Sequence, residues 1–169
     1  SNARTFPWRN KSATRYQQIV SEVLLQQTRA ETVARLYHHF FREFPSWKAL
    51  ARARKPTIAK VIKPLGLYNR RSESLSRLAK HVVSINARFP DDREQLEQIP
   101  AVGQYVASAI LLFCHGRPEP LLDVNMARIL ERYFGPRQMA DIRYDPYLQD
   151  LARQVVGKAK DPRLINWAI

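Results

Sequence analysis

One carboxylate stands where it could do chemistry. Asp123 follows Leu121 and Leu122 and precedes a segment with helical spacing. A carboxylate beside apolar side chains is partly desolvated, so it could stabilise the positive charge that develops on a sugar when a glycosidic bond breaks. A simpler interpretation makes Asp123 a helix N-cap. The two are compatible, because a cap hydrogen bond would also fix the direction of the carboxylate.

A second candidate is a turn that could bind a phosphate. Residues 99–106 read Ile-Pro-Ala-Val-Gly-Gln-Tyr-Val and place a proline and Gly103 between two short amphipathic segments. The first N–H groups of a helix that begins near Gln104 would be unpaired and would favour an anion. Taken alone, the same pattern also fits an ordinary loop.

Helices must position both features, because apolar residues recur at helical spacing along most of the chain. Four stripes lie within residues 16–24, 33–44, 58–65 and 75–85. Further helices are expected at Arg93–Gln98, Gln104–Cys114, Val124–Phe134 and Pro146–Val156. No stretch alternates with period two for long enough to predict a sheet. The pattern therefore predicts an all-α protein.

The composition indicates a folded, basic protein. The 169 residues include 28 Lys and Arg against 15 Asp and Glu, a formal charge of +13, and 45% are hydrophobic. The longest nearly apolar run, Val106 to Cys114, is about half of the ~20 residues that cross a membrane. We therefore expect no membrane partner. The charge favours phosphate-bearing partners, although a ribosomal, membrane-surface or merely basic protein would share it.

Cysteine and histidine offer no metal site. Cys114 is the single cysteine, so neither an internal disulfide nor a cysteine-based structural metal is expected. His38 and His39 have no third ligand at metal spacing. The compartment is expected to be reducing. The opening Ser-Asn-Ala is typical of the remnant left by tag cleavage and is set aside.

Four blocks together resemble one superfamily. They are Pro7-Trp8-Arg9, residues 21–28 (Ser-Glu-Val-Leu-Leu-Gln-Gln-Thr), residues 99–106, and residues 122–125 (Leu-Asp-Val-Asn) with Arg128. Their order and spacing are similar to the helix-hairpin-helix (HhH-GPD) DNA glycosylases, in the branch of the adenine glycosylase MutY and the T/G-mismatch thymine glycosylases. The resemblance extends from Phe6 to the last residue.

The resemblance implies a helix-hairpin-helix DNA glycosylase fold. A six-helix barrel with the hairpin would span residues 15–134. A second helical lobe would be formed by the N- and C-terminal segments, residues 4–14 and 135–169. The implied partner is double-stranded DNA that contains a mismatch, bound by a monomer. A bacterial source would imply a cytoplasmic, nucleoid-associated enzyme.

The resemblance also assigns the candidate catalytic residues. Asp123 matches the invariant catalytic aspartate. Tyr105 stands where the lyase-active relatives of endonuclease III carry a Schiff-base lysine, and tyrosine is no amine nucleophile, so hydrolysis without AP-lyase activity is implied. Glu22 matches the glutamate that protonates adenine in MutY. In an unknown helix, Glu22 would instead be interpreted as a solvated residue beside the apolar stripe.

DNA contacts are assigned in the same way. Gln26 resembles the MutY glutamine that enters the base stack, although by composition alone it would be an ordinary surface residue. The basic residues between Arg52 and Lys63 are either a solvated helix face or a further contact. The full set of candidate DNA-binding residues is Gln26, Gln27, Thr28, Leu67, Arg70, Arg71, Val102, Gly103, Gln104, Asn125 and Arg128.

The base that is removed stays open at this point. Residues 21–28 favour adenine opposite guanine or 8-oxoguanine, and this is the first choice. Residues 66–71 and 131–135 look more like the thymine glycosylases, so thymine or uracil opposite guanine is the alternative. A non-catalytic helix-hairpin-helix DNA-binding module is the second alternative. Ala101 replaces the usual first glycine of the hairpin, so we expect the turn to avoid a conformation that only glycine takes easily.

A cofactor is expected only outside the given residues. Relatives continue past the match to residues 166–169 into four cysteines that bind a 4Fe-4S cluster. The chain as given cannot bind the cluster, which is expected if the natural chain continues beyond Ile169.

Overall fold

The computed structural model describes residues 6–168, so the predicted tag remnant lies outside the described residues. These residues form helices and connecting loops without a strand, which confirms the all-α prediction. No helix in the described range is both long and apolar enough to cross a membrane.

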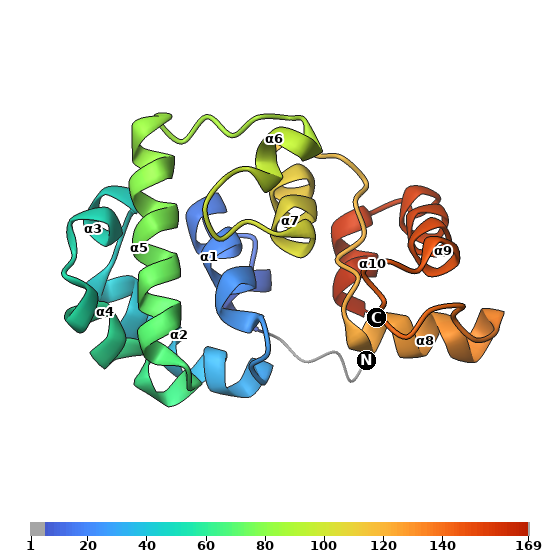
Figure 1. Cartoon of the computed structure of the whole chain (residues 1–169), viewed down its shortest axis with the longest axis horizontal. Helices are drawn as coiled ribbons and strands as arrows, with labels where there is room; N and C mark the ends of the chain where they lie inside the picture. Colours follow the sequence, from blue (N-terminus) through green and yellow to red (C-terminus); the bar gives the residue numbers. More distant parts are fainter. Residues whose placement is uncertain (1–5, 169) are drawn as a thin grey trace. The chain divides into compact units, whose positions relative to one another are not determined.

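The chain divides into two compact units, up to Gly103 and from Gln104 onward. The predicted barrel had its boundary at residue 134, and that division stays a prediction. The helices of the first unit (Figure 1) are η1 (Pro7–Arg9), α1 (Arg15–Leu25), α2 (Ala30–Glu43), α3 (Trp47–Arg52), α4 (Lys55–Ile62), η2 (Lys63–Leu65), α5 (Tyr68–Ser84) and α6 (Arg93–Glu97).

Side-chain caps define where several of these helices begin. Thr14 and Gln17 form a reciprocal capping box at the start of α1, Ser46 caps α3, and Asp92 caps α6. The long helix α5 packs against α3 and α4 (Figure 1). The apolar stripes predicted from the sequence form the core of this unit. Its fully buried residues include Ile19, Val20, Val33, Phe40, Leu50, Ile58, Leu75, Leu78 and Val82.

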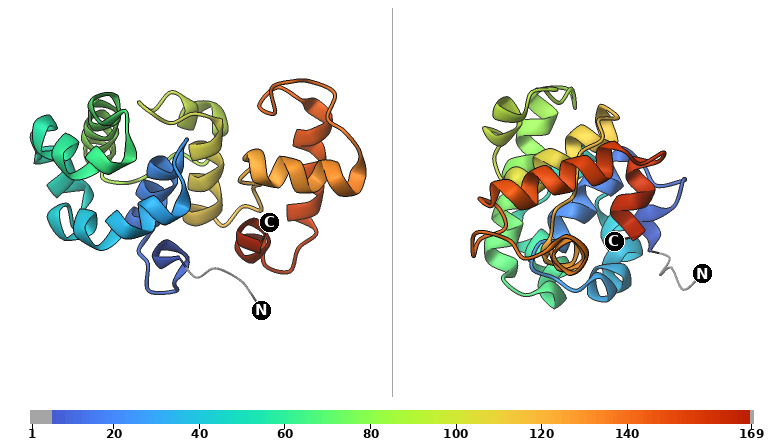
Figure 2. Two further views of the ribbon diagram at one scale, coloured as in Figure 1. Left: turned by 90° about the horizontal axis from the view of Figure 1, so that it is seen from below. Right: turned by 90° about the vertical axis from the view of Figure 1, so that its right-hand side faces the viewer.

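The second unit contains α7 (Gln104–Cys114), α8 (Val124–Phe134), α9 (Pro146–Gly157) and α10 (Pro162–Ala168). Helix α9 lies across α8 (Figure 2), and the contact is an apolar cluster. The buried members of this cluster are Met126, Ala127, Leu130, Leu148, Ala152 and Val156. A second cluster joins α7 to the chain just before α8 through Ala109, Leu112, Phe113 and Leu121.

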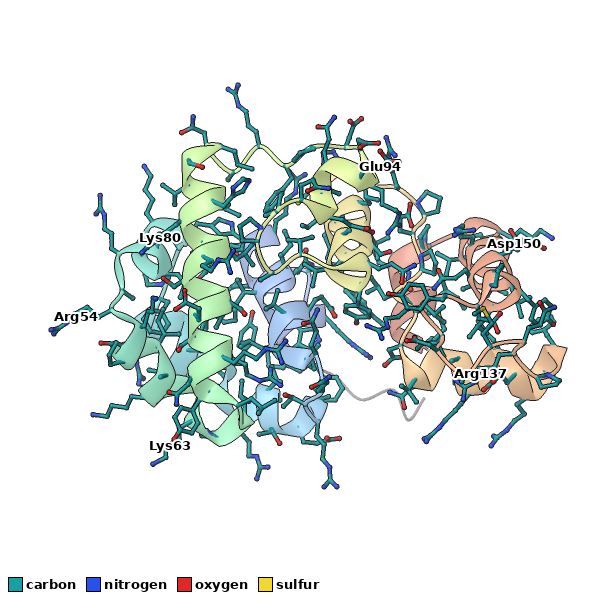
Figure 3. The ribbon with its side chains drawn as sticks, in the orientation of Figure 1. Arg54, Lys63, Lys80, Glu94, Arg137 and Asp150 are labelled. Carbon is teal, nitrogen blue, oxygen red and sulfur yellow. The ribbon has the colours of Figure 1, made fainter. Side chains whose placement is uncertain are left out.

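Charged side chains project away from both units. Arg54, Lys63 and Lys80 extend outward from the first unit, as do Arg137 and Asp150 from the second (Figure 3). The large positive excess is therefore displayed to solvent, where it attracts phosphates through space.

One carboxylate of the second unit is an exception. Asp145 caps α9 and is fully buried. Its oxygens accept backbone N–H groups of Gln138 at 2.5 Å, Met139 at 2.6 Å and Leu148 at 2.8 Å. Burial acts to raise the pKa of Asp145, but these N–H donors outweigh it, and the pKa is lowered. Asp145 thus ties the loop after α8 to the start of α9.

Because the pKa of Asp145 is lower in the folded protein, its stabilisation is present above about pH 4 and is lost as the pH falls through the folded-state value. We expect Asp145→Asn to lower the free energy of unfolding by about 1–3 kcal/mol at pH 7, because an amide NH₂ replaces an acceptor. The difference from the parent should shrink at pH 3. Urea unfolding at both pH values measures it, with the exposed Asp150→Asn on α9 as control. An equal difference at both pH values would contradict this role.

Candidate active site

Asp123 is the N-cap of α8 and is half-buried. Its Oδ1 accepts the backbone N–H groups of Asn125 at 3.0 Å and Met126 at 2.8 Å. Its Oδ2 accepts the side-chain amide of Asn125 at 3.0 Å. The cap interpretation is confirmed, and the cap bonds fix the direction of the carboxylate. Asn125, predicted from the sequence only as a DNA contact, also orients Asp123.

The segment that leads into Asp123 is anchored on both sides within the second unit. Leu121 is buried in the α7 cluster, and Leu122 packs against the cluster between α8 and α9. Asn166 of α10, which is 9% exposed, holds the backbone of the same segment. Its Oδ1 accepts the N–H of Leu121 at 2.6 Å, and its Nδ2 donates to the carbonyl of Glu119 at 3.0 Å and to that of Pro162 at 2.7 Å.

Asn166 was not among the candidates from the sequence, because its three partners lie up to 47 residues away. The only signal was its place in the family-like stretch at residues 166–169. Its contacts assign it to the positioning of Asp123.

An Asn166→Asp variant tests this contact set. The carboxylate keeps the acceptor for Leu121 but loses both donors and faces two carbonyl oxygens. We expect the free energy of unfolding to fall by about 3 kcal/mol, because buried polar groups lose their partners. Urea unfolding measures the free energy of unfolding of Asn166→Asp and of Asn69→Asp, which makes the same change at an exposed position. Equal stability of the two variants would contradict the anchoring role.

Tyr105 lies in the first turn of α7 and is half-buried. It packs against the cluster that contains Leu121, two residues before Asp123. The same cluster therefore holds Tyr105 and the segment that leads into Asp123.

The hairpin turn differs from its prediction. Ala101 has a φ of +65°, whereas Gly103 has no positive φ, so the expectation that the turn avoids a left-handed residue is wrong. The Val102 N–H donates to the Ile99 carbonyl at 3.0 Å. Proline at the second position and a positive φ at the third are typical of a type II turn. Burial of Ile99 and Val102 on either side of the turn offsets the strain at Ala101.

The remaining hairpin candidates differ in exposure. Val102 is buried, Gly103 is exposed and Gln104 is half-buried at the start of α7. Val102 therefore contributes to the core, while the backbone at Gly103 is accessible to a phosphate.

Glu22 lies on α1 in the first unit and is only 3% exposed. The interpretation as a solvated surface residue is wrong. A buried carboxylate is costly unless the surrounding structure supports it, and such residues are enriched at functional sites. The structure therefore favours a specific role for Glu22.

Gln27 and Leu67 are two of the five described non-glycine residues of the first unit that have left-handed backbones, the others being Asn86, Ala87 and Ala101. Gln27, in the loop after α1, has a φ of +56°, and Leu67, the N-cap of α5, has a φ of +47° and is 63% exposed. Gln26 beside Gln27 is exposed as well. Strained residues that persist in a folded protein cluster at ligand-binding sites.

Arg71 lies one turn into α5 and is half-buried. Its guanidinium donates to the carbonyls of Leu24 at 3.2 Å and Gln26 at 2.7 Å and to the hydroxyl of Thr28 at 2.8 Å. Burial lowers its pKa. The candidates Arg71 and Thr28 thus bond to each other, whereas Arg70 and Arg128 are exposed.

A surface hollow of about 510 Å³ lies between α4 and the start of α5. Lys60, Lys63 and Tyr68 are among its lining residues, as is Lys55, which pairs with Glu73. Within the described residues neither Lys60 nor Lys63 is paired with a carboxylate. Lys60 and Lys63 therefore give this surface, which includes Tyr68 next to Leu67 in the chain, a positive charge.

A family model described as "HhH-GPD superfamily base excision DNA repair protein" matches residues 20–154. The chain belongs to this family. The family resemblance and fold inferred from the sequence are thereby confirmed.

The relatives separate the two candidate bases. A thymine-DNA glycosylase of Aeropyrum pernix is 41% identical over 160 residues, which cover 94% of this chain and 71% of the relative. An adenine DNA glycosylase of Mycobacterium tuberculosis is 34% identical over 130 residues, which cover 76% of this chain and 42% of the relative. The solved structure of a thermostable thymine-DNA glycosylase has a TM-score of 0.83 at 31% identity, covering 100% of this chain and 80% of that one.

These findings confirm that the chain is a DNA N-glycosylase, a hydrolase of N-glycosyl bonds. They also correct the ranking of the bases. The thymine and uracil alternative is better supported than the adenine interpretation that the sequence analysis placed first.

Proposed function

We propose that this protein is a monofunctional glycosylase that removes thymine or uracil mispaired with guanine from double-stranded DNA. The observation that carries the proposal is the extent of its likeness to thymine-DNA glycosylases, which covers 94% of the chain in sequence and 100% in structure. The adenine glycosylase likeness covers 76%. A T·G wobble pair also costs less to open than a matched pair, which gives the enzyme some intrinsic selectivity.

Three features of the first unit support binding of duplex DNA. The exposed, left-handed Gln27 and Leu67 can fill the gap that a flipped base leaves. Lys60 and Lys63 add positive charge beside Leu67. The backbone at Gly103 is accessible and can bind a phosphate. We propose that a single copy of the chain binds the DNA, as expected from the family resemblance.

Asp123 supplies the electrostatic part of the proposed reaction. The bond between C1′ of the sugar and N1 of the pyrimidine breaks, and the electron pair leaves with the base. The carboxylate of Asp123 stabilises the oxocarbenium-like charge on the sugar. Water then bonds to C1′ and its proton neutralises the base, so the products are the free pyrimidine and an abasic site.

Tyr105 and Glu22 fit this chemistry in different ways. Tyr105 carries no amine, so no Schiff base forms at its position and the DNA strand stays intact. A pyrimidine has no purine nitrogen for Glu22 to protonate. We therefore propose that the Glu22 carboxylate acts on the attacking water, which it orients or deprotonates as a general base.

The residues of this sequence do not supply the ligands of a 4Fe-4S cluster. A 4Fe-4S cluster needs four thiolates, and Cys114 is the single cysteine of the sequence, so these residues do not fit one. The described residues also contain no group of three or more His, Cys, Asp or Glu that could hold a metal ion.

An Asp123→Asn variant tests the electrostatic role. Asparagine is an equally good N-cap, so the fold should persist while single-turnover excision falls by about 100- to 10,000-fold. Affinity for mismatched duplex should be kept or improve, since a negative charge is removed. Gel-shift and excision assays measure the two quantities. A variant that excises as fast as the parent would eliminate the electrostatic role of Asp123, whereas a parent that excises no base would support a non-catalytic DNA-binding module.

A duplex panel tests the base. We expect excision from T·G and U·G, and none from A·G or A·8-oxoguanine, since the protein resembles thymine glycosylases along its whole length. Strands should break only after alkali, and borohydride should trap no covalent complex, because Tyr105 is no amine. Denaturing gels with and without alkali measure both outcomes. Excision of adenine alone would overturn the choice of base, and efficient trapping would reveal another amine nucleophile.

A further inference from the structure

Gln27 and Leu67, two of the exposed residues of the first unit with left-handed backbones, lie on segments that Arg71 connects. Gln27 follows α1, and Leu67 precedes α5, 40 residues later in the chain. Arg71 bonds to both loops. Its backbone N–H donates to the carbonyl of Leu67 at 3.0 Å, and its guanidinium binds the residues on either side of Gln27.

The guanidinium binds the residues before and after Gln27 and makes no hydrogen bond to the Gln27 side chain. Nη2 donates to the carbonyl of Gln26 at 2.7 Å and to the hydroxyl of Thr28 at 2.8 Å. Nη1 donates to the carbonyl of Leu24 at 3.2 Å, near the end of α1. Because the flanking residues are held, the side chain of Gln27 remains exposed and its left-handed backbone is maintained.

Only an arginine can make this set of contacts. The planar fork presents several N–H donors in fixed directions, whereas a lysine has one ammonium group that is more strongly hydrated. The half-buried position adds a desolvation cost, which lowers the pKa of Arg71. The three charge-assisted hydrogen bonds act against that cost. A merely solvated arginine of α5, such as Arg77, has no comparable contacts among the described residues.

We infer that Arg71 is a positioning residue that fixes Gln27 and Leu67 relative to each other, so that both enter the DNA at the step from which the base is flipped. This inference rests on the proposed function. It replaces the direct DNA contact that the sequence analysis expected of Arg71. The residue then acts on base flipping through the two loops, and the hydrolysis of an already extrahelical base does not depend on it.

The test compares a paired with an unpaired uracil. Single-turnover excision is measured on a duplex with U·G and on the same duplex with the uracil in a three-nucleotide bubble. We expect Arg71→Ala to slow excision from U·G by about 10- to 100-fold, the range that corresponds to a lost set of charge-assisted hydrogen bonds. Excision from the bubble should stay within about threefold of the parent, since no base pair has to open.

Matched variants separate positioning from other roles. Arg77→Ala, at an exposed position of the same helix, should leave both substrates unaffected. Arg71→Lys keeps the charge but not the fork, so its loss on U·G should lie between those of the parent and Arg71→Ala. Thermal unfolding monitored by circular dichroism identifies any variant that fails to fold, and Arg71→Lys then carries the test.

The outcomes distinguish the inference from the proposed function. Equal losses on U·G and on the bubble, or no loss on either, overturn the role of Arg71 and leave the glycosylase proposal standing. A parent that cuts U·G but leaves the bubble uncut also overturns the role, because flipping is then not the step that separates the substrates. A parent that cuts neither substrate overturns both.

Discussion

The ends of short helices impose the constraint on which this structure depends. A helix leaves unpaired N–H groups at its start and unpaired carbonyls at its end, and each must find a partner. Asp123 accepts the first N–H groups of α8, and Arg71 takes carbonyls at the end of α1. The candidate functional groups are therefore also the groups that complete the backbone hydrogen bonding. The hydrogen bonds at the helix ends therefore fix the orientation of the Asp123 and Arg71 side chains.

Long apolar stripes made most helices predictable. Gln104–Cys114 and Val124–Phe134 begin and end where the sequence placed them, because each combines helical spacing with a clear start or stop. The helices α3 and α10 were missed. With six and seven residues they are too short for a stripe to repeat. Ala101 was mispredicted for a different reason, since tertiary burial of its neighbours outweighs the local cost of a positive φ.

The candidate site was predictable in its residue types but not in its connections. Asp123 could be recognised from its leucine neighbours and the helix that it begins. The hydrogen bonds from Asn166 to Leu121 and from Arg71 to Gln26 join positions more than 40 residues apart. No local sequence pattern encodes such pairs. The sequence also ranked the two candidate bases differently from the comparisons, because residues 21–28 and residues 66–71 favour different bases. Similarity over most of the chain is what favours the thymine and uracil alternative.

In the proposed function, the left-handed conformations of Gln27 and Leu67 place part of the energetic cost of DNA recognition in the folding of the free protein. Holding a non-glycine residue in this region costs about 1–2 kcal/mol, and the folded protein bears that cost before any DNA arrives. The loops consequently need little ordering on encounter, so association loses less conformational entropy than it would with flexible tips. Glycine at either position would relieve strain in the free protein, but its greater backbone freedom would raise the conformational entropy lost when the loop is ordered on DNA.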